Sequence, residues 1–355
     1  MAIRGNESLV EFVTVLLSSY TTAFVAVDFA ESLVILVGNA MIMLSVLLIQ
    51  PRKEMLIIAG LAFSDFVYGV GSLAHSVQTV RLTYSGLLHT VKISAWECML
   101  YAQTILFIVG KQSIGLMLCV VSVDRFLAVT FPNRYLALGR RYALLVLGTV
   151  MTHNVASAVV ALSSSYWLTS PERLLHAKCI SYQAVPKFYG DYAEFVAAAG
   201  GYSSVLLYVA VIWSYRRMVF RASQQKRQAK TNQLQRQKRL TITLGIVTGC
   251  TLATSSIPYT IVLLINNGII PVGPAEKPVA LSWIFSLIRV NFMVNVFIYF
   301  WRQADMRAAI LALLTCQRGS LLLQANDTSV LQCTTMLGVE PPTTSASTDS
   351  TPVDH

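Results

Sequence analysis

Ionisable side chains stand inside long apolar stretches of this sequence, at positions that suggest ion or ligand binding. Asp65 lies in the apolar stretch 61–66, and Lys111 and Arg289 lie in two other such stretches. A charge at the centre of a membrane-spanning helix costs roughly 2.5–3.5 kcal/mol on insertion scales, so such residues are normally functional. For Asp65 two interpretations stay open: a hydrogen-bonded residue that only packs helices, or a water- or cation-filled switch site. We favour the second, with sodium as the candidate ion.

Uncharged polar residues form a second group near Asp65. Three of them recur every fourth residue and therefore share one face of a helix: Asn291, Asn295 and Tyr299. This face should look into a bundle, because lipid offers polar groups no partner. Asn39 stands beside Gly38, a small residue that permits close helix approach. We expect Asn39, Asp65 and the three-residue face to form one hydrogen-bonded core.

The apolar stretches themselves predict an all-α membrane protein. Hydrophobic residues make up 55% of the chain and charged residues 12%, against about 25% charged in soluble domains. A spanning helix needs about 20 apolar residues and satisfies its backbone internally. Seven stretches qualify: 23–49, 55–81, 96–131, 142–166, 191–218, 240–266 and 279–301. We therefore predict a seven-transmembrane helix bundle over 23–302, with a short amphipathic helix after the seventh span at 303–316.

Basic residues predict the orientation of the bundle. Lys and Arg number 18 in the segments after the odd-numbered spans and seven on the opposite side. The positive-inside rule makes the richer side cytoplasmic. We expect a plasma-membrane protein with an extracellular amino terminus at 1–22 and a disordered cytoplasmic tail at 317–355. The net charge of +10 then reflects contact with anionic lipid and cytosolic partners, and nucleic acid is not an expected partner.

Cysteines and a sequon on the expected outer side predict covalent modification. Cys98 and Cys179 both face the oxidising side and form a disulfide candidate, the alternative being two free thiols. Asn6 begins a glycosylation sequon. Cys316 follows the amphipathic stretch and could carry a palmitate or stay unmodified. The five histidines are scattered without ligand spacing, so we expect no metal site, no cofactor besides the candidate sodium, and no enzyme.

A set of motifs is distributed along the predicted spans: Gly38-Asn39, Leu61-Ala62 with Asp65, the cysteines Cys98 and Cys179, Asp124-Arg125-Phe126, Tyr208, Pro258, and Asn295 with Tyr299. Together these motifs resemble a rhodopsin-like G-protein-coupled receptor over residues 20–316. The chain also resembles nematode chemoreceptor-like branches in the run 297–302 and in 305–307.

Other positions depart from the family pattern and indicate a divergent branch. Val296 stands in place of a proline, as does Gly200, eight residues before Tyr208. Ser256 replaces a tryptophan two residues before Pro258. No acidic residue near the start of span six can hold Arg125. The resemblance therefore implies the fold more firmly than the details of the switch.

The resemblance implies a receptor that binds an extracellular ligand and shifts a pre-existing equilibrium. Arg125, Tyr208 and Tyr299 would rearrange as span six swings about Pro258, opening a cavity for a heterotrimeric G protein. Nucleotide exchange occurs on that partner, so the chain is not an enzyme. The Ser/Thr-rich tail could bind arrestin and a receptor kinase. A channel or carrier with a receptor-like bundle is the alternative.

The ligand candidates lie above this switch. Lys111 precedes Arg125 by 14 residues, roughly 21 Å along a helix, and Arg289 has a comparable depth. Two buried cations indicate a ligand that carries a carboxylate, a small molecule or a peptide. For Arg289 the alternative is an internal ion pair with Glu31 or Asp28. Other candidates for the pocket are His75, Tyr101, Phe107 and Tyr259, of which the aromatic residues could equally be packing.

Overall fold

The computed structural model describes residues 4–48, 52–87, 91–169, 174–224, 242–243, 245–273 and 276–315. Within them, seven helical segments are long and apolar enough to span a membrane, which confirms the predicted bundle. These segments are Ala23–Leu48, Lys53–Tyr84, Ala102–Thr130, Arg140–Leu168, Lys187–Arg217, Gly245–Asn266 and Lys277–Arg302.

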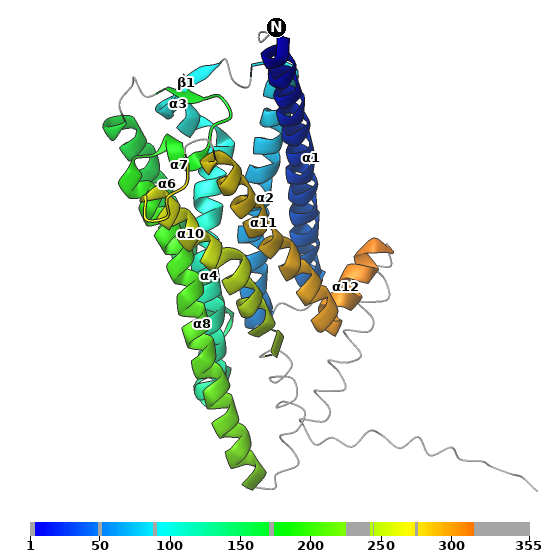
Figure 1. Ribbon diagram of the computed structural model, residues 1–355. Helices are drawn as coiled ribbons and strands as arrows, with labels where there is room; N and C mark the ends of the chain where they lie inside the picture. The colour runs from blue at the N-terminus through cyan, green and yellow to red at the C-terminus, as the bar shows by residue number, and fades with distance from the viewer. Residues whose placement is uncertain are drawn as a thin grey trace, which may run out of the picture.

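The seven long helical segments run along the bundle, and the short elements outside them lie at its ends (Figure 1). The elements in chain order are α1 (Arg4–Leu48), α2 (Lys53–Tyr84), β1 (Lys92–Ser94), α3 (Ala95–Leu100), α4 (Ala102–Thr130), α5 (Pro132–Ala137), α6 (Arg140–Leu168), β2 (Leu174–His176), α7 (Ser181–Ala184), α8 (Lys187–Gln224), the π-helical turn η2 (Leu252–Ser256), α10 (Ile257–Asn266), α11 (Lys277–Arg302) and α12 (Ala304–Leu314). The antiparallel pair of β1 and β2 marks one end of the bundle, called here the disulfide end, and Arg125 marks the other.

The third span starts later than predicted. A stretch at 96–131 was expected to form one helix, but α3 ends at Leu100 and α4 begins at Ala102. Tyr101 between them has an extended backbone, φ −69° and ψ 130°. Ser94 and Glu97 form a capping box that starts α3 as a helix of its own.

Helix α4 occupies the centre of the bundle and packs against α2, α6 and α8. Many large apolar side chains on the outer faces stay exposed, among them Leu145, Leu206 and Trp301. A soluble protein rarely exposes so much continuous apolar surface, whereas lipid covers it in a membrane. Polar side chains are concentrated inside the bundle instead, which is the arrangement that the sequence pattern predicted.

The sixth span contains a helical irregularity directly before a proline. Pro258 lacks a backbone N–H and cannot continue the normal hydrogen-bond ladder of a helix. The preceding turn, η2, is π-helical, and the N–H of Ile257 bonds the carbonyl of Leu252. Such turns are rare in α-helices and frequently lie at functional sites. The span therefore has a built-in point of bending beside Pro258.

A short helix follows the seventh span, as predicted. The chain turns at Gln303, where the backbone is extended, and α12 then packs against α1 and α11 (Figure 1). Met306, Ala309 and Ile310 form its buried face. Cys316, the tail 317–355, the basic loop 225–241 and the side chain of Asn6 lie outside the described residues.

Candidate functional site

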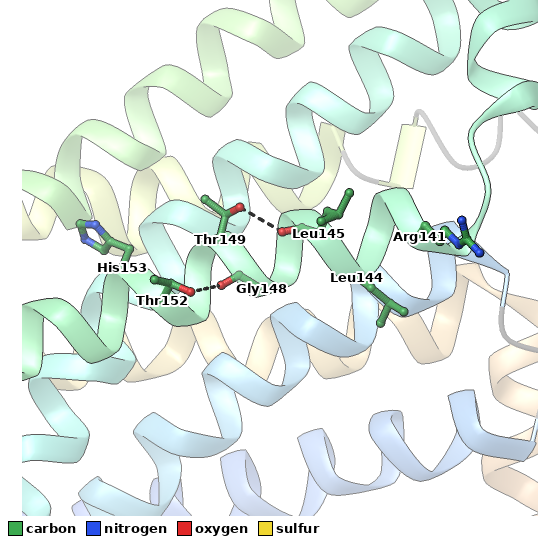
Figure 2. A pocket seen from close by; sticks show the side chains of 7 residues that line it. All are labelled: Arg141, Leu144, Leu145, Gly148, Thr149, Thr152 and His153. Atoms are coloured by element: carbon green, nitrogen blue, oxygen red, sulfur yellow. Dashed lines mark hydrogen bonds between the residues drawn. The ribbon is translucent and has the colours of Figure 1, made fainter.

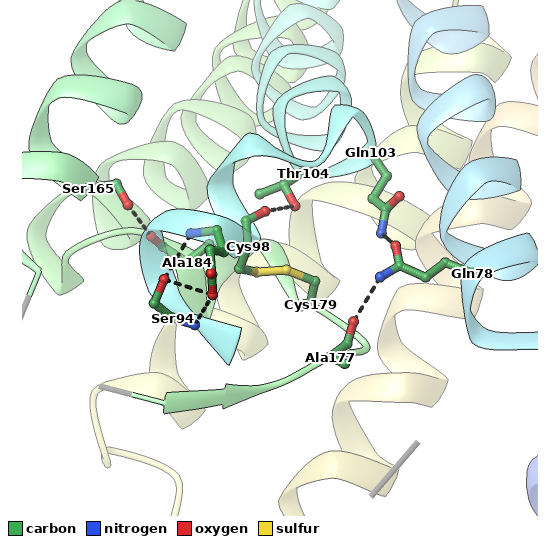
Figure 3. The surroundings of a disulfide bond; sticks show 10 residues. Gln78, Ser94, Cys98, Gln103, Thr104, Ser165, Ala177, Cys179 and Ala184 are labelled. Carbon is green, nitrogen blue, oxygen red and sulfur yellow. Dashed lines mark hydrogen bonds between the residues drawn. A yellow bond between two sulfur atoms is a disulfide. The ribbon is translucent and has the colours of Figure 1, made fainter. Parts of the chain in front are cut away.

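A disulfide fixes the loop that covers one end of the bundle. Cys98 and Cys179 are bonded, with Cα atoms 5.5 Å apart, which confirms the predicted pair (Figure 3). The side-chain amide of Gln78 donates a 2.8 Å hydrogen bond to the carbonyl of Ala177, and Gln103 donates to Gln78. The loop segment 177–179 is therefore attached to both α2 and the α3–α4 region.

Lys178 sits between these two attachment points and is partly buried. Burial lowers the pKa of Lys178; the nearby Asp28 carboxylate opposes this effect, and the Arg289 guanidinium adds to it. The side chain therefore lies close enough to the Asp28 and Arg289 charges to interact with them. Sequence reasoning counted Lys178 only as a loop charge, although its position next to the bridging Cys179 was a signal that it lies close to the bundle.

Lys111 forms a buried ion pair that was not predicted. Its ammonium lies 2.6 Å from the Glu194 carboxylate of α8, and the two side chains are 9% and 2% exposed. The Lys111 ammonium also lies 5.9 Å from the ring centre of Tyr259. The sequence carried a signal for Glu194, because it precedes Tyr208 by 14 residues just as Lys111 precedes Arg125. The ligand contact expected for Lys111 must therefore compete with Glu194.

Arg289 takes the alternative that the sequence left open for it. Its guanidinium pairs with both Asp28 and Glu31 of α1, with 2.6 Å between Arg289 Nε and Glu31 Oε2. Ser286 donates a 2.8 Å hydrogen bond to the other oxygen of Glu31. This cluster joins the first and seventh spans and leaves the guanidinium already occupied.

The remaining pocket candidates divide between the interior and the mouth. Phe107 packs edge-on against Tyr68 and His75, with ring centres 5.1 and 5.8 Å apart. Tyr101 is half exposed at the α3–α4 break, ten residues and about 15 Å of helix from Lys111. Tyr101 therefore lies at the mouth of the bundle and does not line a wall beside Lys111.

The polar core around Asp65 is only partly the single network that the sequence predicted. Asn295 donates a 3.2 Å hydrogen bond to Asp65, whereas Asn39 donates to Ile35 of its own helix. Thr254 of η2 donates to Asn291 at 3.2 Å. Five buried polar atoms have no partner among the described residues: Asn39 Oδ1, Asp65 Oδ1, Asn291 Nδ2, Asn295 Oδ1 and Tyr299 Oη. Buried polar groups normally bond protein or ordered water, so this group suits water or a cation.

At the opposite end, Arg125 is held by its neighbour and by a tyrosine. Its Nε donates to Asp124 at 3.0 Å, and its Nη2 lies 3.3 Å from the hydroxyl of Tyr135 in α5. The Tyr135 hydroxyl donates to Asp124 at 3.0 Å and reaches Glu54 of α2 at 3.3 Å. Burial raises the pKa of Tyr135 far above its ordinary range, so the hydroxyl keeps its proton. Arg125 thus has partners although span six offers no acid.

Comparison with known proteins identifies this arrangement. The family model described as 7 transmembrane receptor (rhodopsin family) matches residues 38–299, nearly three quarters of the chain. The chain belongs to this family. Its matched region begins at Gly38 within the first span and ends at Tyr299 near the end of the seventh, so it includes the polar core and the Arg125 group. The protein is a multi-pass membrane receptor of a family that is not enzymatic.

A human relative shares part of the receptor sequence. Olfactory receptor 11A1 from Homo sapiens is 31% identical over 207 residues, which cover 55% of this chain and 58% of that protein. The chain thus spans less than two thirds of the length of the relative it matches.

In this receptor, two residues that depart from the family pattern, Gly200 and Ser256, lie at neighbouring contacts between spans. A Cβ on Gly200 of α8 would overlap the backbone carbonyl of Gly115 in α4. A Cβ on the next residue, Gly201, would overlap the hydroxyl of Ser256 in η2. Small residues therefore let spans three and five touch by backbone, one turn below Lys111, and let the Ser256 side chain of span six lie directly on the backbone of span five. Sequence comparison found Gly200 and Ser256 singly, but their contact partners became visible only in the fold.

Tyr208 carries this packing toward the Arg125 end. A Cβ on Gly245 in span six would lie 2.7 Å from the Tyr208 hydroxyl, so the ring rests directly on that backbone. Between the two levels, Ser122 and Ser204 hydroxyls are 2.6 Å apart. Tyr299 is buried on the same inner face of α11 as Asn291 and Asn295. The predicted switch residues therefore occupy one continuous interior.

The outward face of α6 carries a shallow groove of a different character (Figure 2). The hydroxyls of Thr149 and Thr152 bond carbonyls of their own helix at 3.0 and 2.9 Å. The groove thus presents mainly apolar atoms to the surroundings. Its lining belongs to one span, includes Arg141 at one end, and shares no residue with the charged groups described above.

Proposed function

We propose that this receptor detects a small extracellular ligand at its disulfide end and activates a heterotrimeric G protein from its Arg125 end. The observation that carries this proposal is the buried Lys111–Glu194 pair. It joins two spans that both continue to the switch residues, Arg125 in α4 and Tyr208 in α8. A ligand that alters this pair can therefore bias both helices at once.

The proposed orientation places the disulfide end outside the plasma membrane. The excess of Lys and Arg in the segments toward the other end supports it, and so does the Cys98–Cys179 bond, because disulfides persist in oxidising compartments. The carboxyl-terminal tail, with its Ser and Thr residues, then faces the cytosol, where arrestin and a receptor kinase are the proposed additional partners.

A carboxylate on the ligand is the proposed recognition group. Lys111 is the residue that the sequence predicted to contact the ligand. A ligand carboxylate would replace the Glu194 oxygen that Lys111 now binds. The name of the human relative, an olfactory receptor, supports chemosensory detection over other roles. A sodium ion beside Asp65 is part of the proposal, supported by the unpartnered oxygens of Asn39, Asp65 and Asn295.

G-protein activation in cells that express the receptor tests the proposal. A screen of small molecules should give active compounds whose potency falls in Lys111→Ala. Arg125→Ala should abolish activation while surface expression and ligand binding persist. Ligand-dependent ion or solute flux in cells without G proteins would overturn the receptor mechanism in favour of a channel or carrier. Acidic active compounds that lost nothing in Lys111→Ala would overturn the carboxylate contact.

A further inference from the structure

The charges described at the disulfide end balance within two groups. Lys111 pairs with Glu194, one positive and one negative charge. The second group contains Arg289, which pairs with Asp28 and Glu31. Lys178 lies near this group and interacts electrostatically with Asp28. The Lys111–Glu194 pair is therefore electrically neutral and does not borrow a partner from the second group.

Neutrality of this pair restricts which ligand can bind it. A ligand that carries only a carboxylate would displace Glu194 from Lys111 and leave a buried carboxylate without a partner. A ligand that carries only an ammonium would leave Lys111 unpaired in the same way. A buried charge that loses its partner is strongly unfavourable, more so than replacing the whole pair. A singly charged ligand is thus disfavoured, because the charged residue that it does not bind is left buried without a partner.

Two unpartnered atoms show where a ligand donor would fit. Glu194 Oε2 and the Tyr259 hydroxyl have no hydrogen-bond partner among the described residues, and each residue is only 1% exposed. Native proteins rarely leave such buried polar atoms unbonded. The Lys111 ammonium has three donors, one of which bonds Glu194 Oε1. The pair therefore has unused capacity for a donor on the Glu194 side and an acceptor on the Lys111 side.

We infer that the ligand is a small zwitterion of the amino-acid type. Its ammonium bonds Glu194 and the Tyr259 hydroxyl, and its carboxylate bonds Lys111. One ion pair is replaced by two, so no buried charge loses its partner. This inference rests on the proposed function and sharpens the carboxylate contact into a two-charge recognition.

Insertion of such a ligand also acts on the helix packing below it. Lys111 stands one helical turn before Gly115, and Glu194 stands six residues before Gly200. Since Gly115 and Gly200 are already in backbone contact, a group placed between Lys111 and Glu194 pushes α4 and α8 apart next to this contact. Ligand binding is thereby converted into movement of the third and fifth spans.

Matched probes test the charge requirement in the full-length receptor. Free amino acids that range from alanine to leucine and phenylalanine are compared with three capped forms of each. The N-acetyl form is an anion, the amide form is a cation, and the doubly capped form is neutral. G-protein activation is measured in cells, with surface density as the control for folding. The free amino acid should activate, and each capped form should be weaker by about tenfold or more.

Variants that remove one charge of the pair should change which form of the ligand is preferred. Glu194→Gln should favour the N-acetyl anion, and Lys111→Met should favour the amide cation. Each single change leaves a buried charge unpaired and could impair folding, so the double variant Lys111→Met/Glu194→Gln is included. It removes both charges and should lose the preference for the zwitterion over the doubly capped form.

The outcomes separate this inference from the proposed function. Equal potency of a free amino acid and its N-acetyl form would overturn the zwitterion and leave the carboxylate receptor standing. Activation by another compound, with no response to any free amino acid, would overturn the inference of a zwitterionic ligand and leave the proposed function standing. If a well-expressed double variant still preferred the zwitterion over the doubly capped form, the Lys111–Glu194 pair would not be the group that recognises ligand charge. Ligand-dependent flux without G proteins would overturn the proposed function itself.

Discussion

Gly115 of α4 and Gly200 of α8 face each other so closely that neither helix could carry a side chain there. A Cβ on Gly115 would lie 2.9 Å from the carbonyl oxygen of Val196, and one on Gly200 would overlap the Gly115 backbone. A proline at position 200, which the family resemblance led us to expect, would place a ring at this point. The glycine is therefore part of a different way of joining these two spans.

Gly200→Ala should destabilise the receptor. The added methyl group must push apart two backbones that have no flexible side chain to give way, and overpacking of this kind costs about 1–3 kcal/mol. Thermal unfolding of the purified receptor should occur at a lower temperature than in the wild type.

Gly148→Ala is the matched control, because a Cβ there would meet no atom within 4 Å. Alanine favours a helix over glycine by up to about 1 kcal/mol, so this variant should be as stable as the wild type or more so. Equal loss of stability in both variants would mean that glycine flexibility matters and the close contact does not.

Gly201→Ala should be partly rescued by a second change in span six. The new methyl group would overlap the Ser256 hydroxyl and lie 3.0 Å from Ser256 Cβ. Ser256→Ala removes the hydroxyl and leaves the Cβ, so the double variant relieves most of the clash. Residues in contact show coupling energies of about 0.5–3 kcal/mol in double-mutant cycles. Additive losses of unfolding free energy would show that Gly201 and Ser256 do not touch in the folded receptor.

The length, number and polarity of the spans were predictable from the sequence because they depend on local composition. Seven apolar stretches gave seven helices, and the period of four placed Asn291 and Asn295 on one buried face. The predicted start of the third span was wrong. The capping box at Ser94 and Glu97 begins a separate short helix, and the extended backbone at Tyr101 separates that helix from α4.

Contacts between spans were less predictable, because they depend on which helix faces meet. Asp28 and Glu31 were named as partners for Arg289 because the resemblance made the first and seventh spans neighbours. Glu194 was not paired with Lys111, because its matching distance from Tyr208 gives its depth along the span but not which helix face meets Lys111. Tyr135 was missed because it lies in the short helix α5, outside the spans that were searched for buried polar groups.

Tyr135→Phe should raise basal G-protein activation. The change removes only the hydroxyl that donates to Asp124 and lies 3.3 Å from Arg125. The proposed mechanism moves Arg125 on activation, so loss of about 1 kcal/mol of the hydrogen bonding that holds it would raise the active fraction roughly fivefold while that fraction is small. The active fraction is measured as basal G-protein activation divided by the number of receptors at the cell surface.

Tyr166→Phe serves as the control, since Tyr166 is exposed near the disulfide end. Basal activity that stays at the wild-type value in Tyr135→Phe would show that Asp124 alone holds Arg125. Because burial keeps the Tyr135 hydroxyl protonated, a rise in pH from 6 to 9 should not release this contact by itself.

The pH dependence of stability should reveal the burial of Lys178. Its pKa is lowered in the folded receptor, so the unfolded chain binds more protons as pH rises through the folded pKa toward the ordinary lysine value of 10.5. Stability rises with pH wherever the unfolded state binds more protons. The wild type should therefore gain stability over this interval relative to Lys178→Met, which has no proton to lose. Unfolding of both proteins in the same detergent, followed between pH 7 and pH 10, provides the comparison. Lys277→Met, at the start of α11, is the control for loss of a lysine charge at the same end. A difference between wild type and Lys178→Met that stays constant across this range would place the Lys178 ammonium in solvent.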